Sequence, residues 1–123
     1  MPKVIHFEIP AKDTKRAVAF YKKAFGWKFD KYGGEGMDYW LVTAGDEKET
    51  GINGAISGKD ATHPTTINTI SVASFEDAVK KIKAAGGEVL GPKMTVPNVG
   101  YMVYCKDTEG NIFGIMQTDP KAR

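Results

Sequence analysis

The chain has 123 residues, of which 41% are hydrophobic and 26% charged, and this balance excludes a disordered or fibrous protein. Its formal charge of +2 comes from 17 basic and 15 acidic residues that are interspersed, which argues against nucleic acid as a partner. No apolar stretch approaches the roughly 20 residues that cross a bilayer, and the first residues lack the apolar run of a signal peptide. We therefore expect a single domain with no membrane partner and a cytoplasmic location.

The first element is a predicted strand over residues 4–9, whose side chains alternate between two faces. One face is purely apolar and has to be covered, and the following helix is the nearest element that can do so. This apolar face consists of Ile5, Phe7 and Ile9, and the opposite face carries Val4, His6 and Glu8. A histidine and a carboxylate on an uncovered face mark a candidate ligand site.

A helix is predicted over residues 14–25. Asp13 is a favourable N-cap, and Gly26 can adopt the left-handed conformation that ends a helix. Its apolar stripe is expected to contain Ala17, Phe20, Tyr21 and Ala24.

Three strands are predicted next, over residues 27–32, 37–43 and 51–57, and the first of them is broken by the glycines of residues 33–36. In the third, Ile52 and Ile56 share one face, while Gly51, Asn53 and Ala55 share the other. Residues 59–65 are polar with a proline and are expected to form a linker, in which His63 is expected to be solvated.

The pattern then starts again with a predicted strand over residues 66–73. Ser74 begins a capping box before a helix that Gly86 and Gly87 end, and strands are predicted at 88–90, 100–105 and 112–117. Cys105 lies in an apolar run and is interpreted as a structural thiol. Residues 119–123 are expected to be a loose tail.

The order strand, helix, strand, strand, strand therefore occurs twice, over residues 1–58 and 66–118, which predicts an α+β fold of two equivalent modules. If each module covers one sheet face with its helix, the remaining faces can curl around a shared cavity. Its predicted lining combines His6 and Glu8 with small or apolar residues, namely Asn53, Ile67, Thr69, Gly114 and Met116. Such a lining suits a small, partly hydrophobic organic molecule. The facing of Tyr39, Trp40, Tyr101 and Tyr104 stays open.

Three stretches carry a resemblance to a known family: HFEIPAKDTKRAVAFYKKAFGW near the start, AVKKIKAAGG in the middle and DTEGNIFGIMQ near the end. With these, the chain resembles the vicinal oxygen chelate superfamily, which includes glyoxalase I, bleomycin resistance proteins and extradiol dioxygenases. The resemblance implies paired βαβββ modules around an open cavity, and it implies association as a homodimer.

Metal-bearing members of that superfamily place one ligand on each of four strands. The matching positions here are His6, Asn53, Ile67 and Gly114, of which His6 is the one plausible ligand. We therefore expect no metal ligand set and no other cofactor, because a divalent ion needs several donors to displace its water.

Two principal functions remain open. The first is metal-independent binding of a small amphipathic molecule with His6 and Glu8 as polar anchors. The second is a lyase, isomerase or dioxygenase related to glyoxalase, in which His6 holds a metal with unusual partners or acts as general base, with Glu8 beside it. A regulatory or scaffolding domain without a small ligand is a third alternative.

Overall fold

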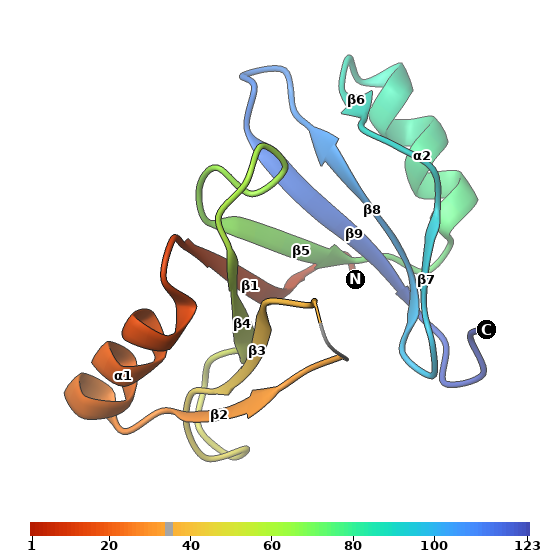
Figure 1. Cartoon of the computed structure of the whole chain (residues 1–123). Coiled ribbons are helices and arrows are strands. Elements are labelled where there is room, and N and C mark those ends of the chain that lie inside the picture. Colours follow the sequence, from red (N-terminus) through yellow and green to blue (C-terminus); the bar gives the residue numbers. More distant parts are fainter. Residues whose placement is uncertain (34–35) are drawn as a thin grey trace. The chain divides into compact units, whose positions relative to one another are not determined.

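In the computed structural model, which describes residues 1–33 and 36–123, each helix follows one strand and precedes a run of strands (Figure 1). The elements are β1 (Val4–Ala11), α1 (Thr14–Phe25), β2 (Lys28–Lys31), β3 (Tyr39–Thr43), β4 (Gly54–Gly58), β5 (Ile67–Ser71), α2 (Phe75–Ala84), β6 (Glu88–Val89), β7 (Met94–Val96), β8 (Gly100–Lys106) and β9 (Ile112–Thr118). The predicted α+β class is confirmed. The glycine break predicted at 33–36 lies partly outside the described residues.

The chain divides into two compact units. The first unit, His6–Ile67, has the strand order β2-β3-β4-β1, in which β1 and β4 run parallel. The second unit combines Met1–Ile5 with Asn68–Arg123, and in it β5 pairs with β9, which pairs with β8. The N-terminal residues join the second unit through a hydrogen bond of 2.7 Å from the Ser71 N–H to the Lys3 carbonyl.

The bounds predicted for the first helix are confirmed at Thr14 and Phe25. The Asp13 carboxylate accepts a hydrogen bond of 3.0 Å from the Arg16 N–H, which satisfies one free donor of the first turn. Gly26 has a φ of 71°, the left-handed conformation that closes the helix at low cost.

The core of the first unit lies between α1 and the sheet. It centres on Val18, Val42 and Ile56, and Phe7 and Ile9 pack against them as predicted. The prediction that Phe20 belongs to the buried stripe was wrong, because its side chain is 58% exposed. Val18 and Tyr21 form the side of α1 that packs on the sheet, and Phe20 lies about 100° away from Tyr21 around the helix axis. Ile5 is also 41% exposed, because α1 covers the later part of β1.

The second unit repeats this arrangement around α2. The Ser74 hydroxyl accepts a hydrogen bond of 3.2 Å from the Asp77 N–H, as the capping box predicts. Phe75, Val103 and Ile115 form the core together with Cys105. Burial raises the pKa of the Cys105 thiol to about 11, so the thiol stays protonated at neutral pH and is a poor nucleophile.

Two predictions for this unit were wrong. The strand β7 was missed because its three residues stand between Pro92 and Pro97, and it exists through antiparallel pairing with β8. The tail is not loose, because the Ala122 carbonyl accepts a hydrogen bond of 3.0 Å from the Asn98 N–H and Ala122 is fully buried. No helix within the described residues is long and apolar enough to span a membrane.

Candidate functional site

Strand register in the first unit gathers polar side chains on the sheet face that α1 does not cover. Glu8 pairs with Ala55, and Tyr39 pairs with Ser57, so each pair lies on one face. Because Phe7, Ile9 and Ile56 pack under α1, the alternate residues point the other way. We call the resulting surface the His6 face, and it comprises His6, Glu8, Tyr39, Ala55 and Ser57.

His6 and Tyr39 form the first polar pair on this face. The Nε2 atom of His6 lies 3.0 Å from the Tyr39 hydroxyl oxygen, and both residues are half-buried. Burial lowers the pKa of His6 from 6.5, and the negative charge of Glu8 offsets part of this effect. Burial also raises the pKa of Tyr39, with further contributions from Glu8 and Tyr32. Both side chains are therefore neutral near pH 7, a hydrogen-bonding pair without formal charge.

Glu8 and His63 form the second pair. The Nε2 atom of His63 lies 3.0 Å from Oε2 of Glu8. The side chain of His63 is 16% exposed, and that of Glu8 is 3% exposed. A hydrogen bond to an ionised group is roughly twice as strong as one between neutral groups, and this one is largely shielded from water. The pair therefore ties the segment between β4 and β5 to β1.

The expectation that His63 is solvated was wrong, and Asp60 explains why. The Asp60 carboxylate accepts hydrogen bonds from the backbone N–H groups of Thr62, at 2.8 Å, and His63, at 2.9 Å. These bonds form a tight turn that directs the imidazole toward Glu8. In the sequence, Asp60 precedes Thr62 by two residues and His63 by three, and this spacing was the signal for the turn. The Thr62 hydroxyl also donates a hydrogen bond of 2.7 Å to this carboxylate, and this bond, followed by the bond from the Thr62 backbone N–H, lowers the pKa of Asp60 to about 2.

The other predicted site residues lie in different settings. Asn53 precedes β4, and its Oδ1 accepts a hydrogen bond of 2.9 Å from the Ala44 N–H. Ile67 is fully buried in β5. Thr69 and Gly114 are paired in register on β5 and β9, and Met116 is the next residue but one on β9. A methyl group on Gly114 would lie 3.0 Å from the Thr69 hydroxyl, so these two strands are closely packed.

The structure settles the facing of four aromatic residues that the sequence left open. Trp40 and Tyr101 pack against the cores under α1 and α2 respectively. Tyr39 lies on the His6 face, and Tyr104 pairs with Gly114 on the face of its sheet opposite α2. Tyr39 is thus the site residue that strand alternation alone did not identify.

Comparison with known proteins agrees with this fold. Residues 3–115 match the model of the Glyoxalase/Bleomycin resistance protein/Dioxygenase superfamily. The chain belongs to this superfamily, as its sequence motifs indicated.

Among curated proteins, the chain is 28% identical over 116 residues to the proposed glyoxylase CFP32 of Mycobacterium tuberculosis and to its counterpart in Mycobacterium bovis. The match covers 91% of this chain but 44% of each relative, so the chain spans less than half the length of these relatives.

Solved structures show the same fold. A methylmalonyl-CoA epimerase in complex with methylmalonyl-CoA matches with a TM-score of 0.72 at 13% identity, over 99% of this chain and 98% of that one. A superfamily member from Vibrio splendidus matches with a TM-score of 0.67 at 12% identity, over 97% and 100% of the two chains.

The residues at the superfamily's metal positions do not fit a metal ion. The amide oxygen of Asn53 is engaged by the Ala44 N–H, and the side chains of Ile67 and Gly114 offer no donor. In residues 1–33 and 36–123, no group of three His, Cys, Asp or Glu side chains is placed to hold a metal. Among the described residues, His6 therefore lacks the additional ligands that a divalent ion requires.

The lowered pKa of His6 predicts a pH dependence of stability. Between the folded pKa and the ordinary value of 6.5, the unfolded chain binds more protons at this residue than the folded chain does. The free energy of unfolding should therefore fall as pH is lowered through 6.5, and the decline from this residue should end below the folded pKa. Urea unfolding of the wild type and His6→Gln at several pH values isolates this contribution. A His6 midpoint above 6.5 in an NMR titration would contradict the prediction.

Proposed function

We propose that this chain binds a small, partly apolar organic molecule against His6 and Tyr39 without a metal ion. The observation that carries the proposal is the half-buried His6–Tyr39 pair, 3.0 Å apart, on the sheet face opposite α1. Neutral donors and acceptors held in a partly desolvated setting match carbonyl, hydroxyl or amide groups rather than strongly charged ligands. The ligand thus belongs to the amphipathic class.

The tautomer of His6 decides which atom meets the ligand. When Nε2 carries the proton, it donates to the Tyr39 oxygen, and the Tyr39 O–H is available to a ligand carbonyl. When Nδ1 carries the proton, the Tyr39 O–H donates to Nε2, and the ligand meets the tyrosine oxygen as an acceptor. In both cases the Tyr39 hydroxyl contacts the ligand, as a donor in the first case and as an acceptor in the second.

Glu8 and His63 support this site from a position beside His6 on the same sheet face. The Glu8 carboxylate is 3% exposed and in contact with Nε2 of His63, so its principal role is to position β1 and the segment 59–65. Its charge also acts on His6 by raising the pKa of the imidazole against the effect of burial. Glu8 is thus a positioning residue that tunes His6.

Metal independence is supported by the donor inventory around His6. Neither Asn53 nor the side chains at the other two family positions supply a free ligand atom. Exposing purified protein to Ni, Zn, Mn and Fe salts and measuring bound metal by elemental analysis tests this part. Tight stoichiometric retention of any of these metals would overturn it.

Ligand binding is tested by screening a library of small carbonyl and hydroxyl compounds by thermal shift, followed by calorimetry on the hits. Tyr39→Phe removes one hydrogen bond and should weaken a hit by about 2- to 12-fold, since a hydrogen bond contributes about 0.5 to 1.5 kcal/mol. Tyr101→Phe is the matched control, because Tyr101 packs in the core under α2. Equal affinities of wild type and Tyr39→Phe for every hit would contradict the assignment of this site.

A second candidate is an enzyme that moves a proton next to a carbonyl group. It is favoured by the neutral state of His6, because an unprotonated imidazole can act as general base near pH 7. The similarity to a proposed glyoxylase and to the fold of a methylmalonyl-CoA epimerase directs the choice of substrates to 2-oxoaldehyde adducts and acyl thioesters. If His6→Ala kept full turnover of an active compound, this candidate would be excluded.

The proposal places the protein in the cytoplasm and makes it a homodimer. Fractionation of cells expressing the tagged chain tests the location. Sedimentation equilibrium tests the association.

A further inference from the structure

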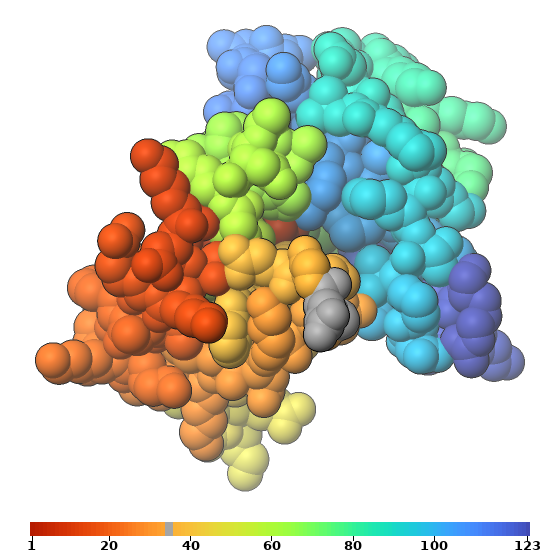
Figure 2. All heavy atoms as spheres, viewed as in Figure 1, coloured from red at the N-terminus to blue at the C-terminus, as the bar shows by residue number. Residues whose placement is uncertain are grey.

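The outer side of α1 combines exposed phenylalanines with basic residues, and the orange-red atoms of this helix form part of the molecular surface (Figure 2). Phe20 is 58% exposed and Phe25 is 65% exposed. Arg16, Phe20 and Lys23 recur at helical spacing, so they lie in one stripe. We call the exposed side of the helix, with these residues and Lys22, the α1 surface. Exposed apolar groups of this kind often belong to interaction sites.

The charge of α1 has one sign. Its four basic residues are Lys15, Arg16, Lys22 and Lys23, all of them exposed, and it contains no acidic residue. In the part of the chain that the structure describes, none of the four has a carboxylate within 4.0 Å. Of the 17 basic residues, the 13 outside α1 are outnumbered by the 15 acidic residues, so positive charge is concentrated on this helix.

The two phenylalanines belong to a cluster of rings that fixes their positions. Their ring centroids lie 6.5 Å apart with the planes at 81°, and Phe25 also lies 6.0 Å from Trp27. Trp27 in turn stacks on Tyr21, with centroids 4.8 Å apart and planes at 6°. Side chains that are held in this way lose little conformational freedom when a partner covers them, which favours binding.

The equivalent helix of the second unit shows that the module does not require such a surface. When the Ala-Val pairs near the start of the two helices are aligned, Phe20 falls opposite Lys81. In its first turn α2 carries Glu76 and Asp77, whereas α1 has no acidic residue there. All large apolar side chains of α2 are buried or half-buried. The exposed rings and the uniform charge are therefore specific to α1.

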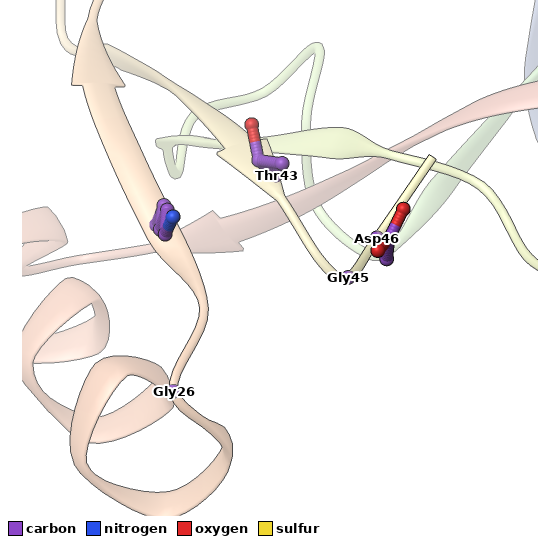
Figure 3. Close-up of a pocket in the computed structure, with 5 residues that line it drawn as sticks. Gly26, Thr43, Gly45 and Asp46 are labelled. Atoms are coloured by element: carbon purple, nitrogen blue, oxygen red, sulfur yellow. The ribbon is translucent and has the colours of Figure 1, made fainter. Parts of the chain in front are cut away.

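A hollow of about 410 Å³ lies where α1 ends (Figure 3). It is lined by Gly26, Lys28, Thr43, Gly45 and Asp46. Because its lining carries a carboxylate as well as an ammonium group, the hollow is a poor site for an anion. The α1 surface therefore ends at Phe25 and does not include the hollow.

We propose that the α1 surface binds an anionic lipid bilayer, with its basic side chains at the phosphate groups and with Phe20 and Phe25 at the boundary to the acyl chains. A negatively charged membrane attracts clustered Lys and Arg side chains. The rings gain further by leaving water at this boundary. The sequence argued against a membrane partner because no stretch can span a bilayer, but contact of this kind requires no spanning segment.

The rings favour lipid over a nucleic acid. Single-stranded nucleic acids bind by stacking their bases on open aromatic faces. Here Tyr21 and Trp27 already stack on each other, and Phe20 and Phe25 meet edge to face. The cluster therefore presents protruding apolar carbon rather than a row of open faces. A lipid surface accounts for these protruding rings and for the uniform positive charge together.

The first experiment measures sedimentation of the purified protein with lipid vesicles. The wild type should sediment with phosphatidylglycerol vesicles at low salt and stay in solution with phosphatidylcholine vesicles, because only the former are anionic. Added NaCl should release it, since salt screens charges at the surface. The absence of binding to phosphatidylglycerol, or equal binding to both lipids, would overturn the proposal.

The second experiment reverses charges on the two helices. Lys22→Glu/Lys23→Glu should lower the partition coefficient for phosphatidylglycerol vesicles by about 25-fold or more, since each basic side chain near the surface contributes about fivefold. Lys81→Glu/Lys83→Glu is the matched control, because it makes the same change in the last turn of α2. The control should bind nearly as tightly as the wild type. An equal loss in both variants would show that net charge, and not the α1 surface, controls binding.

The third experiment tests the rings. Phe20→Gln/Phe25→Gln should weaken vesicle binding by about tenfold while the charge is unchanged. Lipids brominated on their acyl chains should quench the fluorescence of Trp27, which lies beside Phe25, and spare that of Trp40, whose Nε1 atom is buried. Circular dichroism verifies folding, and Phe20→Gln alone is used if the double variant unfolds. Unchanged binding of a folded variant would contradict insertion of the rings.

Two further probes distinguish other anionic partners. Binding to an oligouridylate or to polyglutamate without binding to phosphatidylglycerol vesicles would overturn the proposal and assign the surface to nucleic acid or to acidic protein. The proposal does not depend on the proposed function, because α1 covers the sheet face opposite the His6 face. Lys22→Glu/Lys23→Glu should accordingly leave small-ligand binding at Tyr39 unchanged, and either property can fail without the other.

Discussion

Gly54→Ala should destabilise the protein by about 3 kcal/mol or more, at the upper end of the range for overpacking in a well-packed interior. Gly54 is the first residue of β4 and pairs with Phe7 of β1. A methyl group at this position would lie 2.4 Å from the Phe7 carbonyl oxygen and 2.6 Å from its ring carbons. The backbone oxygen cannot move aside unless β1 separates from β4, and these two strands hold the His6 face together.

Urea unfolding followed by circular dichroism measures this effect. Gly91→Ala is the matched control, because the added methyl group would meet no atom within 4 Å. The control should remain within about 0.5 kcal/mol of the wild type, as surface substitutions usually do. A Gly54→Ala protein as stable as this control would show that β1 and β4 are not in such close contact.

The second large effect is expected for His63→Ala, which should lower the free energy of unfolding by about 3 kcal/mol at neutral pH. The substitution removes the Nε2 group that lies 3.0 Å from a carboxylate only 3% exposed to solvent. A buried charged group that loses a partner keeps the cost of its dehydration without the compensating bond. The segment 59–65 would also lose its anchor on β1.

A double-mutant cycle with Glu8→Gln separates the pair from its surroundings. If the pair is the source of the effect, Glu8→Gln/His63→Ala should be less destabilised than the sum of the two single variants, because the double variant leaves no buried charge at this position. His63→Gln, which keeps an N–H donor, should recover part of the loss. Additive single effects would mean that Glu8 and His63 contribute independently.

Local signals in the sequence were sufficient for most secondary structure. The cap at Asp13 and the glycine at Gly26 define α1 because both act within a few residues of the helix end. The alternation of β1 similarly predicted that Phe7 and Ile9 lie under the helix and that His6 lies on the other side. Signals of this kind depend on the backbone geometry of a short segment, so they can be interpreted without knowledge of the rest of the fold.

Features that depend on distant residues were missed. The strand β7 forms because it pairs with β8 through hydrogen bonds. The prolines on either side of it argue against a strand when the segment is considered alone. Phe20 fits the apolar period of α1 as well as Tyr21 does, and the packing of Val18 on Val42 and Ile56 decides which ring is covered. The tail is held by Asn98, which turns with a φ of 65° after β7.

The sequence by itself determined the superfamily, the repeated order of helices and strands, and the presence of His6 on a sheet face away from its helix. All of these follow from short-range periodicity and from motifs that lie within single segments. Only the tertiary structure decided that His63 meets Glu8 and that Tyr39 meets His6, across 55 and 33 positions of the chain respectively. Contacts over such separations are set by strand register and by the turn at Asp60, and local side-chain preferences do not encode either one.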